Sequence, residues 1–486
     1  MTLPKKHPEW ALKYKQPGSE LRLMKGRYYL YAVTSKWNKE KKRAQKITGK
    51  LLGRITEDKG FIQTGSRLTV LEPRLKELSV KTSGIETLLG PLMKDVLEAL
   101  KKHFGANAES LYCASIMRLT HQAPLKNMEL HFTNDFLSES FPDVPLVDKK
   151  MTALLKGVGE DRQKVAAFFK EFSRPGEHVL MDMTAIHSKS NEMSINQPGY
   201  NSQGCFDPQA NLLLLFSQTQ HEPVYYRLLP GNIRDVKSVK LSLKEAGIND
   251  AVFISDKGFY SEDNATELDE SGLAYITPIK RNHTLIDYKP LQKRGKKGLS
   301  HHFKFQERFI FCTVKKIDEK RTLYTFLDDR LKLEEEQSYL NRIETQKEDK
   351  LNIKDFHKKA HAFGTMSILT NLKKKTPSEI YGYYKSRMEV ETAFDAFKNT
   401  LEADRTYMQN DQALEGWMFI NYLALLAYWR ILKLLVKNEL LTKFSIKDLL
   451  IHVSYIKKIR INDQWHLSEI TDKTKKLLAK LGCTIT

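Results

Sequence analysis

The stretch Thr376–Lys398, TPSEIYGYYKSRMEVETAFDAFK, carries the pattern that decides the fold of this 486-residue chain. Thr376 is a typical helix N-cap, Pro377 suits the first helical position, and Glu379 would complete a capping box. No strong helix breaker follows before Lys398, so the sequence predicts one continuous helix across the whole stretch.

Four polar side chains of this helix are predicted to share one narrow stripe. At 100° per residue they fall within about 60° of arc, and they are Tyr384, Arg387, Glu391 and Lys398. Glu389 falls on the opposite side. A solvated helix face with an Arg–Glu pair at i,i+4 would also explain part of this pattern, and such a pair contributes only about 0.2–0.5 kcal/mol.

Two aspartates upstream occupy predicted strand positions. HVLMDMTAI predicts a buried strand that contains Asp182, and AVFIS predicts a strand that ends directly before Asp256. A carboxylate among apolar strand residues is costly to desolvate unless it has a partner. A hydrogen-bonded aspartate at a strand end is a simpler explanation for Asp256. That explanation is weaker for Asp182, because apolar residues precede it in a run.

The spacing Tyr-x2-Arg-x3-Glu-x6-Lys resembles the Tyr-Arg-Glu-Lys signature of bacterial insertion-sequence DDE transposases. Asp182 in its strand resembles the first acid of that family, and Asp256 in SDKGFY resembles the second. The resemblance makes Glu391 the third catalytic carboxylate. It implies that these three acids hold two Mg²⁺ ions, for which Mn²⁺ can substitute, since oxygen ligands suit both metals.

The remaining residues of the stripe would contact DNA. The resemblance places Tyr384, Arg387 and Lys398 near the phosphates of the scissile bond, where arginine suits bidentate contact and lysine acts as a point charge. Asp395 falls on the same predicted stripe as Glu391, and only the family spacing favours Glu391 over it.

The bulk properties favour a nucleic-acid partner. Lys and Arg number 79 against 59 acids, which gives a net charge of +20. A surplus of this size favours a polyanion as the partner, with a membrane surface as the other candidate.

The four cysteines form no CxxC pair, which argues for a reducing compartment and against a zinc site. The N-terminus, MTLPKKHPEW, has no apolar signal core, so we expect a cytoplasmic, nucleoid-associated protein of a prokaryote.

An apolar segment, Trp417–Val436, requires a membrane check. It contains Asn421, Arg430 and Lys433. Several polar residues within about 20 positions argue against a spanning helix. We therefore expect a buried core helix and no membrane partner.

The N-terminal region is predicted to be β-rich and basic. Leu21–Met24 and Tyr28–Thr34 flank a predicted hairpin turn at Lys25-Gly26-Arg27. Seven Lys or Arg then lie between Lys36 and Lys50. They indicate either an edge strand blunted by lysines or a contact with the DNA backbone, which the nearby tyrosines favour.

The order of predicted elements defines the fold class. Three strands, a helix, a strand, a helix and a strand follow residue 176, an order typical of an α/β ribonuclease-H-like mixed sheet. About 130 residues separate Asp256 from Glu391, which requires a folded insertion. The resemblance implies that this insertion is β-rich and helps bind the transposon end. The family often places a tryptophan there to stack on a displaced base, and this insertion has none, so stacking would fall to a Tyr, Phe or His.

The sequence thus predicts six regions. They are an N-terminal β-rich basic region (1–78), a helical region that either binds DNA or only packs (79–175), the first part of the catalytic core (176–280), the β-rich insertion (281–362), the second part of the core (363–437) and a C-terminal helical region (438–486).

The resemblance covers most of the chain and implies a cut-and-paste transposase. Such an enzyme would bind terminal inverted repeats in double-stranded DNA, cleave the strand to leave a 3′-OH, and join that end to target DNA. We expect a homodimer in a paired-end complex. The alternatives are a ribonuclease-H-like nuclease without strand transfer, a non-catalytic DNA-binding protein derived from a transposase, and a basic membrane-associated protein.

Overall fold

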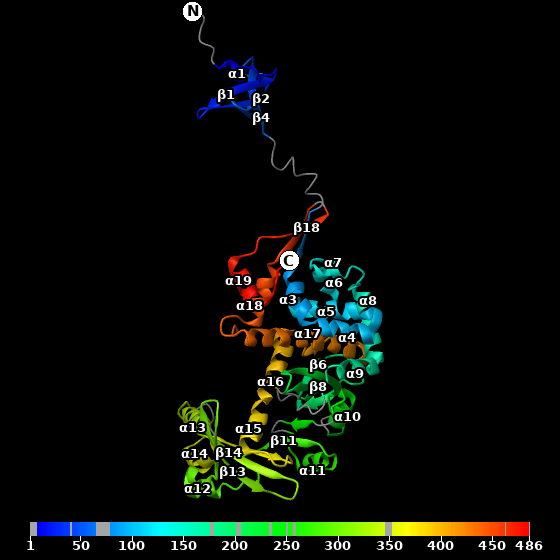
Figure 1. Ribbon diagram of the computed structural model, residues 1–486, viewed down its shortest axis with the longest axis vertical. Helices are drawn as coiled ribbons and strands as arrows, with labels where there is room; N and C mark the ends of the chain where they lie inside the picture. The colour runs from blue at the N-terminus through cyan, green and yellow to red at the C-terminus, as the bar shows by residue number, and fades with distance from the viewer. Residues whose placement is uncertain are drawn as a thin grey trace, which may run out of the picture. The chain divides into compact units, whose positions relative to one another are not determined.

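The computed structural model describes residues 7–38, 41–64, 78–174, 179–200, 206–232, 236–248, 251–255, 259–345, 352–461 and 463–485. The chain divides into two units (Figure 1). One contains Met1–Val80 with Lys458–Ser468, and the other contains Lys81–Lys457 with Glu469–Thr486.

The first unit contains a four-stranded antiparallel sheet whose strands follow chain order. They are β1 (Ser19–Met24), β2 (Arg27–Asn38), β3 (Arg43–Thr56) and β4 (Gly60–Gln63). The predicted hairpin is confirmed: Lys25 (φ 48°) and Gly26 (φ 74°) form a two-residue turn with positive φ at both positions, as type I′ hairpins require.

A second, three-stranded sheet has the order β18-β17-β5. Its strands are β5 (Ser79–Thr82), β17 (Lys457–Ile461) and β18 (Gln464–Leu467). β17 and β18 lie in the chain between helices α18 (Ile446–Ser454) and α19 (Asp472–Lys480). The prediction of a helical region from 438 to 486 is therefore confirmed for α18 and α19 and wrong for β17 and β18. Short strands of mixed polarity are stabilised by a partner distant in the chain, here β5, which no local pattern reveals.

The helical region predicted for 79–175 is confirmed as helical, and one long helix crosses it. The helices of this region are α3 (Gly84–Leu92), α4 (Lys94–Phe104), α5 (Ala108–His121), α6 (Met128–Thr133), α7 (Leu137–Ser140), α8 (Asp148–Glu160) and α9 (Arg162–Lys170). The helix that crosses them is α17 (Asp411–Lys437). Among the described residues, α17 is the one helix with the length and composition to cross a membrane, but 67% of its most apolar window is buried in the fold. The expected core helix is confirmed, and it lies between the other helices and the sheet that contains β6 and β8 (Figure 1).

The region predicted as the first part of the core has the predicted elements in order, with one further short strand, β7, and a mixed α/β fold of the ribonuclease-H-like type. The chain runs through β6 (Val179–Ser188), β7 (Gln197–Tyr200), β8 (Phe206–Ser217), β9 (Glu222–Pro230), α10 (Val236–Ala246), β10 (Val252–Ile254), α11 (Glu262–Glu270) and β11 (Ala274–Ile279). β6, β8 and β9 form an antiparallel meander. β10 lies beside β6 and pairs in parallel with β11.

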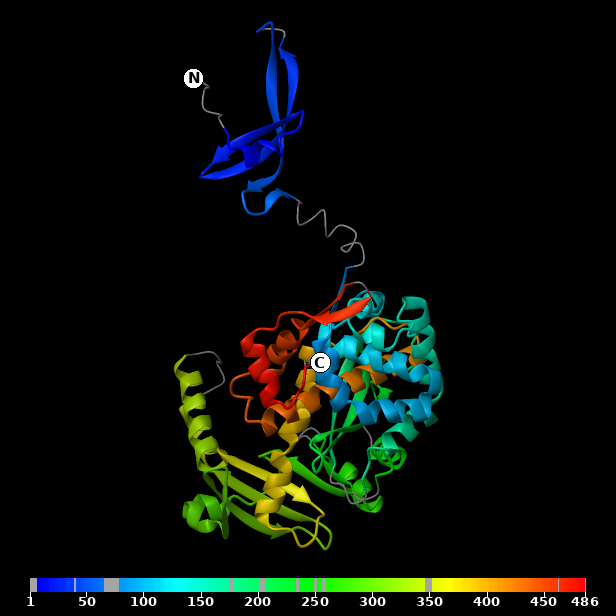
Figure 2. The same ribbon diagram turned by 45° about the horizontal axis from the view of Figure 1, so that its top comes forward.

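The strands of the insertion continue the core sheet. After α12 (Lys289–Arg294) come β12 (His301–Phe305), β13 (Arg308–Lys316), β14 (Thr322–Asp328), α13 (Asp329–Glu344), α14 (Ile353–Lys359) and β15 (Thr365–Thr370). β15 pairs with both β14 and β11, so that one sheet has the order β10-β11-β15-β14-β13-β12. Figure 2 shows the yellow-green and yellow strands of this sheet side by side. The predicted strands HHFKF, RFIFCTV and TLYTFL are confirmed.

The signature stretch begins as predicted, because Thr376 and Glu379 form a complete capping box. The prediction of one continuous helix is wrong. The structure has α15 (Pro377–Lys385), a turn at Ser386, α16 (Arg387–Asp395) and a π-helical turn, Ala396–Thr400. The Ser386 hydroxyl donates to the Tyr383 carbonyl (2.7 Å), a local bond of the kind that competes with the helical ladder.

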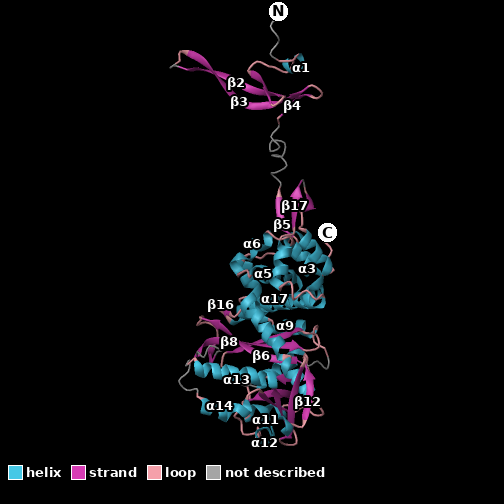
Figure 3. Cartoon of the chain, turned by 90° about the vertical axis from the view of Figure 1, so that its left-hand side faces the viewer, coloured by secondary structure: helices cyan, strands magenta, loops and turns pink. Residues whose placement is uncertain are grey.

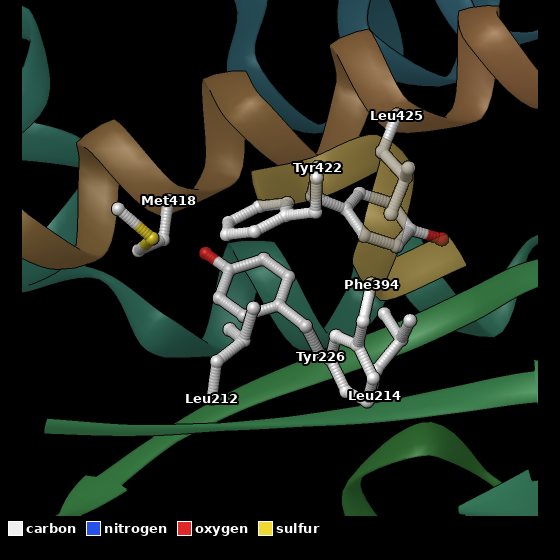
Figure 4. Close-up of a pocket in the computed structure, with 8 residues that line it drawn as sticks. Leu212, Leu214, Tyr226, Phe394, Met418, Tyr422 and Leu425 are labelled. Carbon is white, nitrogen blue, oxygen red and sulfur yellow. The ribbon is translucent and has the colours of Figure 1, made fainter. Parts of the chain in front are cut away.

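The two halves of the signature stretch are anchored differently. Tyr381 of α15 packs against Phe303, Phe305 and Phe326 of the insertion strands, with ring centroids 5.0–5.6 Å away. Phe394 of α16 points instead into the core. It lines a small apolar gap together with side chains of β8, β9 and α17 (Figure 4), namely Leu212, Leu214, Tyr226, Met418, Tyr422 and Leu425. Its lining is almost wholly hydrocarbon, so the gap is part of the core.

Helices α8 and α17 approach each other closely at two glycines. A Cβ at Gly159 would lie 2.0 Å from the Gln412 carbonyl oxygen, and one at Gly416 would lie 2.2 Å from that of Leu155. Real Cβ atoms do not approach backbone so closely, so these glycines set the helix spacing that positions α17 under the sheet.

We therefore expect Gly159→Ala to destabilise the protein by about 1–3 kcal/mol, because the helices must separate. Gly157→Ala on the same helix is the matched control. Its Cβ would meet nothing within 4 Å, and alanine is the better helix former by about 1 kcal/mol. Chemical denaturation of the full chain measures both, and equal effects would contradict the close crossing.

Candidate active site

Asp182 lies in the middle of β6, paired with Leu214 of β8. Its side chain is only 20% exposed. Oδ1 accepts a hydrogen bond from the backbone N–H of Met183 (2.9 Å), and Oδ2 accepts one from Nη2 of Arg387 (3.1 Å). The desolvated carboxylate thus has the charged partner that its position in an apolar strand requires.

The same arginine contacts the predicted third acid. Arg387 Nη1 lies 3.1 Å from Glu391 Oε1, one helical turn further along α16. The Arg387 side chain is 14% exposed and that of Glu391 54% exposed. Because both carboxylates contact one planar guanidinium, Asp182 and Glu391 lie close together although they are distant in the chain.

Asp256 lies outside the described residues. The strand that leads to it, β10, ends at Ile254 and lies beside β6. Ser255, the last described residue before Asp256, is buried and donates a hydrogen bond to Thr277 of β11 (2.9 Å). The end of β10 is therefore anchored to β11.

The other members of the predicted stripe are separated by the breaks in the helix. Tyr384 lies on α15, before the turn at Ser386, and packs partly buried against the core. Lys398 lies in the π-helical turn and is half-buried. Asp395, the rival of Glu391, accepts a hydrogen bond from Asn399 (2.6 Å), whereas Glu391 shares Arg387 with Asp182.

Two side chains of the β8–β9 turn hold the beginning of α16. Gln218 Nε2 donates to Ser386 Oγ (2.7 Å), and His221 Nδ1 lies 3.1 Å from Glu389 Oε1. Sequence reasoning missed both residues, since a polar turn carries no sign of its tertiary partner. It placed Glu389 correctly on the side away from Glu391.

A buried arginine anchors the end of the signature stretch. Arg118 of α5 donates to the Leu401 carbonyl, just after the π-helical turn, and to Asn421 Oδ1 of α17 (3.0 Å). Its guanidinium also lies over the ring of Trp417. Burial lowers the pKa of Arg118 to about 10, so it remains protonated at neutral pH. One arginine within the apolar run of α5 is the signal that could have identified it.

The donor set suits a hard divalent cation. Two carboxylates from different elements converge on one cationic group, and carboxylate oxygens suit Mg²⁺ or Mn²⁺ rather than zinc. Within the described ranges, which stop short of Asp256, no group of three or more His, Cys, Asp or Glu side chains is placed to hold a metal. In this structure the cation that both carboxylates contact is the Arg387 guanidinium.

In this fold, a carboxylate from the first strand of a ribonuclease-H-like sheet lies beside a carboxylate from a packed helix. This combination of fold and site is typical of enzymes that act on the phosphodiester bonds of nucleic acids. The family model described as "Transposase DDE domain" matches residues 173–427, more than half of the chain. The chain belongs to this transposase family.

Comparison with solved structures adds one distant similarity. The chain is similar to the piggyBac transposase in a cryo-EM structure of its synaptic complex with hairpin DNA, with 11% identity over 76% of this chain and 78% of that chain, at a TM-score of 0.37. A score of that size carries no detail, so the assignment rests on the family match. No curated protein matches the chain.

Proposed function

We propose that this transposase is the enzyme of an insertion sequence with a Tyr-Arg-Glu-Lys signature, acting by cut-and-paste. It would bind terminal inverted repeats, cleave one strand to leave a 3′-OH, and transfer that end to target DNA. The observation that carries the proposal is the Arg387 guanidinium, which contacts Asp182 and Glu391 together. Metal-dependent cleavage of a DNA strand requires such a pair, in which a carboxylate from a helix lies close to a carboxylate from a strand.

In this proposal Asp182, Asp256 and Glu391 are the catalytic carboxylates and hold two Mg²⁺ ions, for which Mn²⁺ can substitute. When bound, such a pair activates the attacking water or hydroxyl and stabilises the leaving oxygen. The chain itself supplies the rigidity. β6 fixes Asp182, β10 leads to Asp256, and α16 carries Glu391 on a helix held by Gln218 and His221.

Tyr384, Arg387 and Lys398 are the proposed DNA contacts near the scissile phosphate. In the structure these three residues lie on three consecutive segments, α15, α16 and the π-helical turn, rather than on one helix. Each segment can therefore meet a different part of the DNA backbone. Arg387 offers two parallel N–H groups to a phosphate once they are released from the carboxylates.

The partners follow from the same proposal. We propose double-stranded DNA at the transposon ends and at the target, and a homodimer in a paired-end complex. The net charge of +20 supports a polyanionic partner. The protein would act in the cytoplasm of a prokaryote, at the nucleoid.

A nuclease that cuts without joining is the competing function. Incubation of the full chain with a pre-cleaved transposon end and a target plasmid distinguishes the two. Joined product supports the transposase, and cleavage of uncut ends without any joining supports the nuclease. A non-catalytic DNA-binding protein would show neither reaction.

We expect Asp182→Asn and Glu391→Gln each to abolish cleavage, because each removes a charge that holds the ions, while binding to transposon ends is kept. The same result is expected for Asp256→Asn. Asp395→Asn is the matched control on α16 and should keep cleavage, since Asp395 bonds Asn399 rather than Arg387. Gel assays of cleavage and binding measure both properties, and cleavage retained in Asp182→Asn or Glu391→Gln would remove that residue from the site.

Arg387→Ala should weaken binding to DNA and lower the slope of log K against log salt by about one unit, the effect of one lost phosphate contact. Fluorescence anisotropy with a duplex end over a series of salt concentrations measures that slope. An unchanged slope would assign Arg387 to a purely structural pairing with the two acids.

A further inference from the structure

β2 and β3 continue beyond the N-terminal sheet as a two-stranded ribbon, residues 33–38 paired with 43–48 (Figure 3). β1 pairs with β2 only as far as Ala32, and β4 pairs with β3 only from Gly53 onward. The ribbon therefore projects from a sheet whose small core lies elsewhere, among Leu21, Leu30 and Ile55.

The ribbon is exposed on both faces. All of Arg43–Lys50 is exposed, as is most of the facing strand. Trp37 is 62% exposed and Ile47 45% exposed. A two-stranded hairpin that buries nothing is only marginally stable in water, so a ribbon of this length is expected to gain stability from a partner.

The strand register divides the ribbon into two faces, because directly opposed residues point to the same side. The Asn–Gln face carries the opposed pairs Thr34 with Ile47, Lys36 with Gln45 and Asn38 with Arg43. Asn38 Nδ2 donates to Gln45 Oε1 (3.0 Å), and Asn38 Oδ1 accepts from the Lys41 backbone N–H (3.1 Å). The two amides therefore lie side by side on this face, and contact with a base would replace these bonds.

The opposite face, here called the Trp face, carries Ser35 opposite Lys46 and Trp37 opposite Ala44. Its lysine is neutralised, since Lys46 Nζ lies 2.8 Å from Glu20 Oε1 of β1. The two faces differ in chemistry. One combines two cations with two amides, and the other combines a paired cation with an aromatic ring.

We propose that the Asn–Gln face enters the major groove of duplex DNA and recognises base edges of the terminal repeat. The major groove of B-DNA admits a two-stranded ribbon. Arg and Lys suit guanine O6 and N7, and Asn and Gln suit adenine N6 and N7. This inference rests on the proposed function, which supplies a specific duplex to recognise.

Other polyanions fit this face less well. The major groove of an RNA helix is too deep and narrow for side chains to reach base edges. A membrane surface would use the cations and the exposed Trp37, but it offers no use for a pair of adjacent amides. The amides are therefore the residues that discriminate between duplex DNA and the alternatives.

The test is selection from a random duplex library by the full chain, compared with the double variant Asn38→Ala/Gln45→Ala. We expect the parent to select a defined motif, and the double variant to lose at least one specified position and about tenfold or more of its preference over scrambled duplex. Its affinity for scrambled duplex and its salt slope should stay unchanged, because no charge is removed. A thermal melt checks folding.

Lys46→Ala on the Trp face is the matched control and should keep the selected motif. A double variant that selects the parental motif with parental preference overturns the assignment of the ribbon and leaves the proposed function standing. A parent that selects no motif overturns the proposed function itself. Anionic phosphatidylserine vesicles are the probe for a membrane partner. If the parent and the double variant bind these vesicles equally and neither prefers duplex DNA, the partner of the ribbon is a membrane instead.

A second inference concerns the position of Arg387. Its guanidinium contacts two carboxylates that we propose as metal ligands, and only 14% of its side chain is exposed. Asp182 and Glu391 would hold a divalent ion through the carboxylate groups that now contact Arg387, so the guanidinium would compete with the ion for them. We infer that Arg387 holds the metal position closed until DNA phosphate draws it away.

This inference rests on the proposed metal site, and its test measures metal binding rather than cleavage. Titration of Mn²⁺ into the full chain, followed by electron paramagnetic resonance, should show about tenfold tighter binding for Arg387→Gln than for the parent. Adding a duplex end should tighten Mn²⁺ binding in the parent and change little in the variant. Arg405→Gln, an exposed arginine beside β6, is the control for loss of charge and should behave as the parent does.

Equal or weaker Mn²⁺ binding by Arg387→Gln overturns the inference that Arg387 closes the site. If neither protein binds Mn²⁺ in the presence or absence of duplex, the proposed metal site itself fails. The two failures are therefore distinguishable.

Discussion

The contact on which the site depends is a single guanidinium between two carboxylates. Arg387 joins Asp182 of the first core strand to Glu391 of a helix that follows the insertion. Two negative charges at one partly desolvated point repel each other unless a cation lies between them. The arginine supplies that cation, and it links the sheet to α16 at the place where the proposed chemistry requires both acids.

The break at Ser386 gives the two halves of the signature stretch separate anchors. α15 belongs to the insertion through the ring of Tyr381, and α16 belongs to the core through Phe394 and its contacts with the β8–β9 turn. Glu391 is therefore held near β6 by the contacts of α16 with β6 and β8, while α15 packs against β11 and β12.

Several features were predictable because local patterns report them directly. The capping box at Thr376, the positive-φ turn at Lys25-Gly26, the buried strand around Asp182 and the core helix α17 all depend on residues adjacent in the chain. Hydrophobic periodicity reports burial, and turn chemistry reports backbone geometry. The ribonuclease-H-like order of elements followed from these same signals.

By itself the sequence determined the class of fold, the family spacing of the stripe and the excess of positive charge, because these are properties of neighbouring residues and of composition. Only the tertiary structure decided which acids share Arg387, that β17 would pair with β5, and that the buried Arg118 would reach the Leu401 carbonyl. It also decided which side of the β2–β3 ribbon carries the amides, through a register that includes shifts between Leu30 and Val33. Each of these outcomes depends on a partner far away in the chain, and no local period encodes the identity of such a partner.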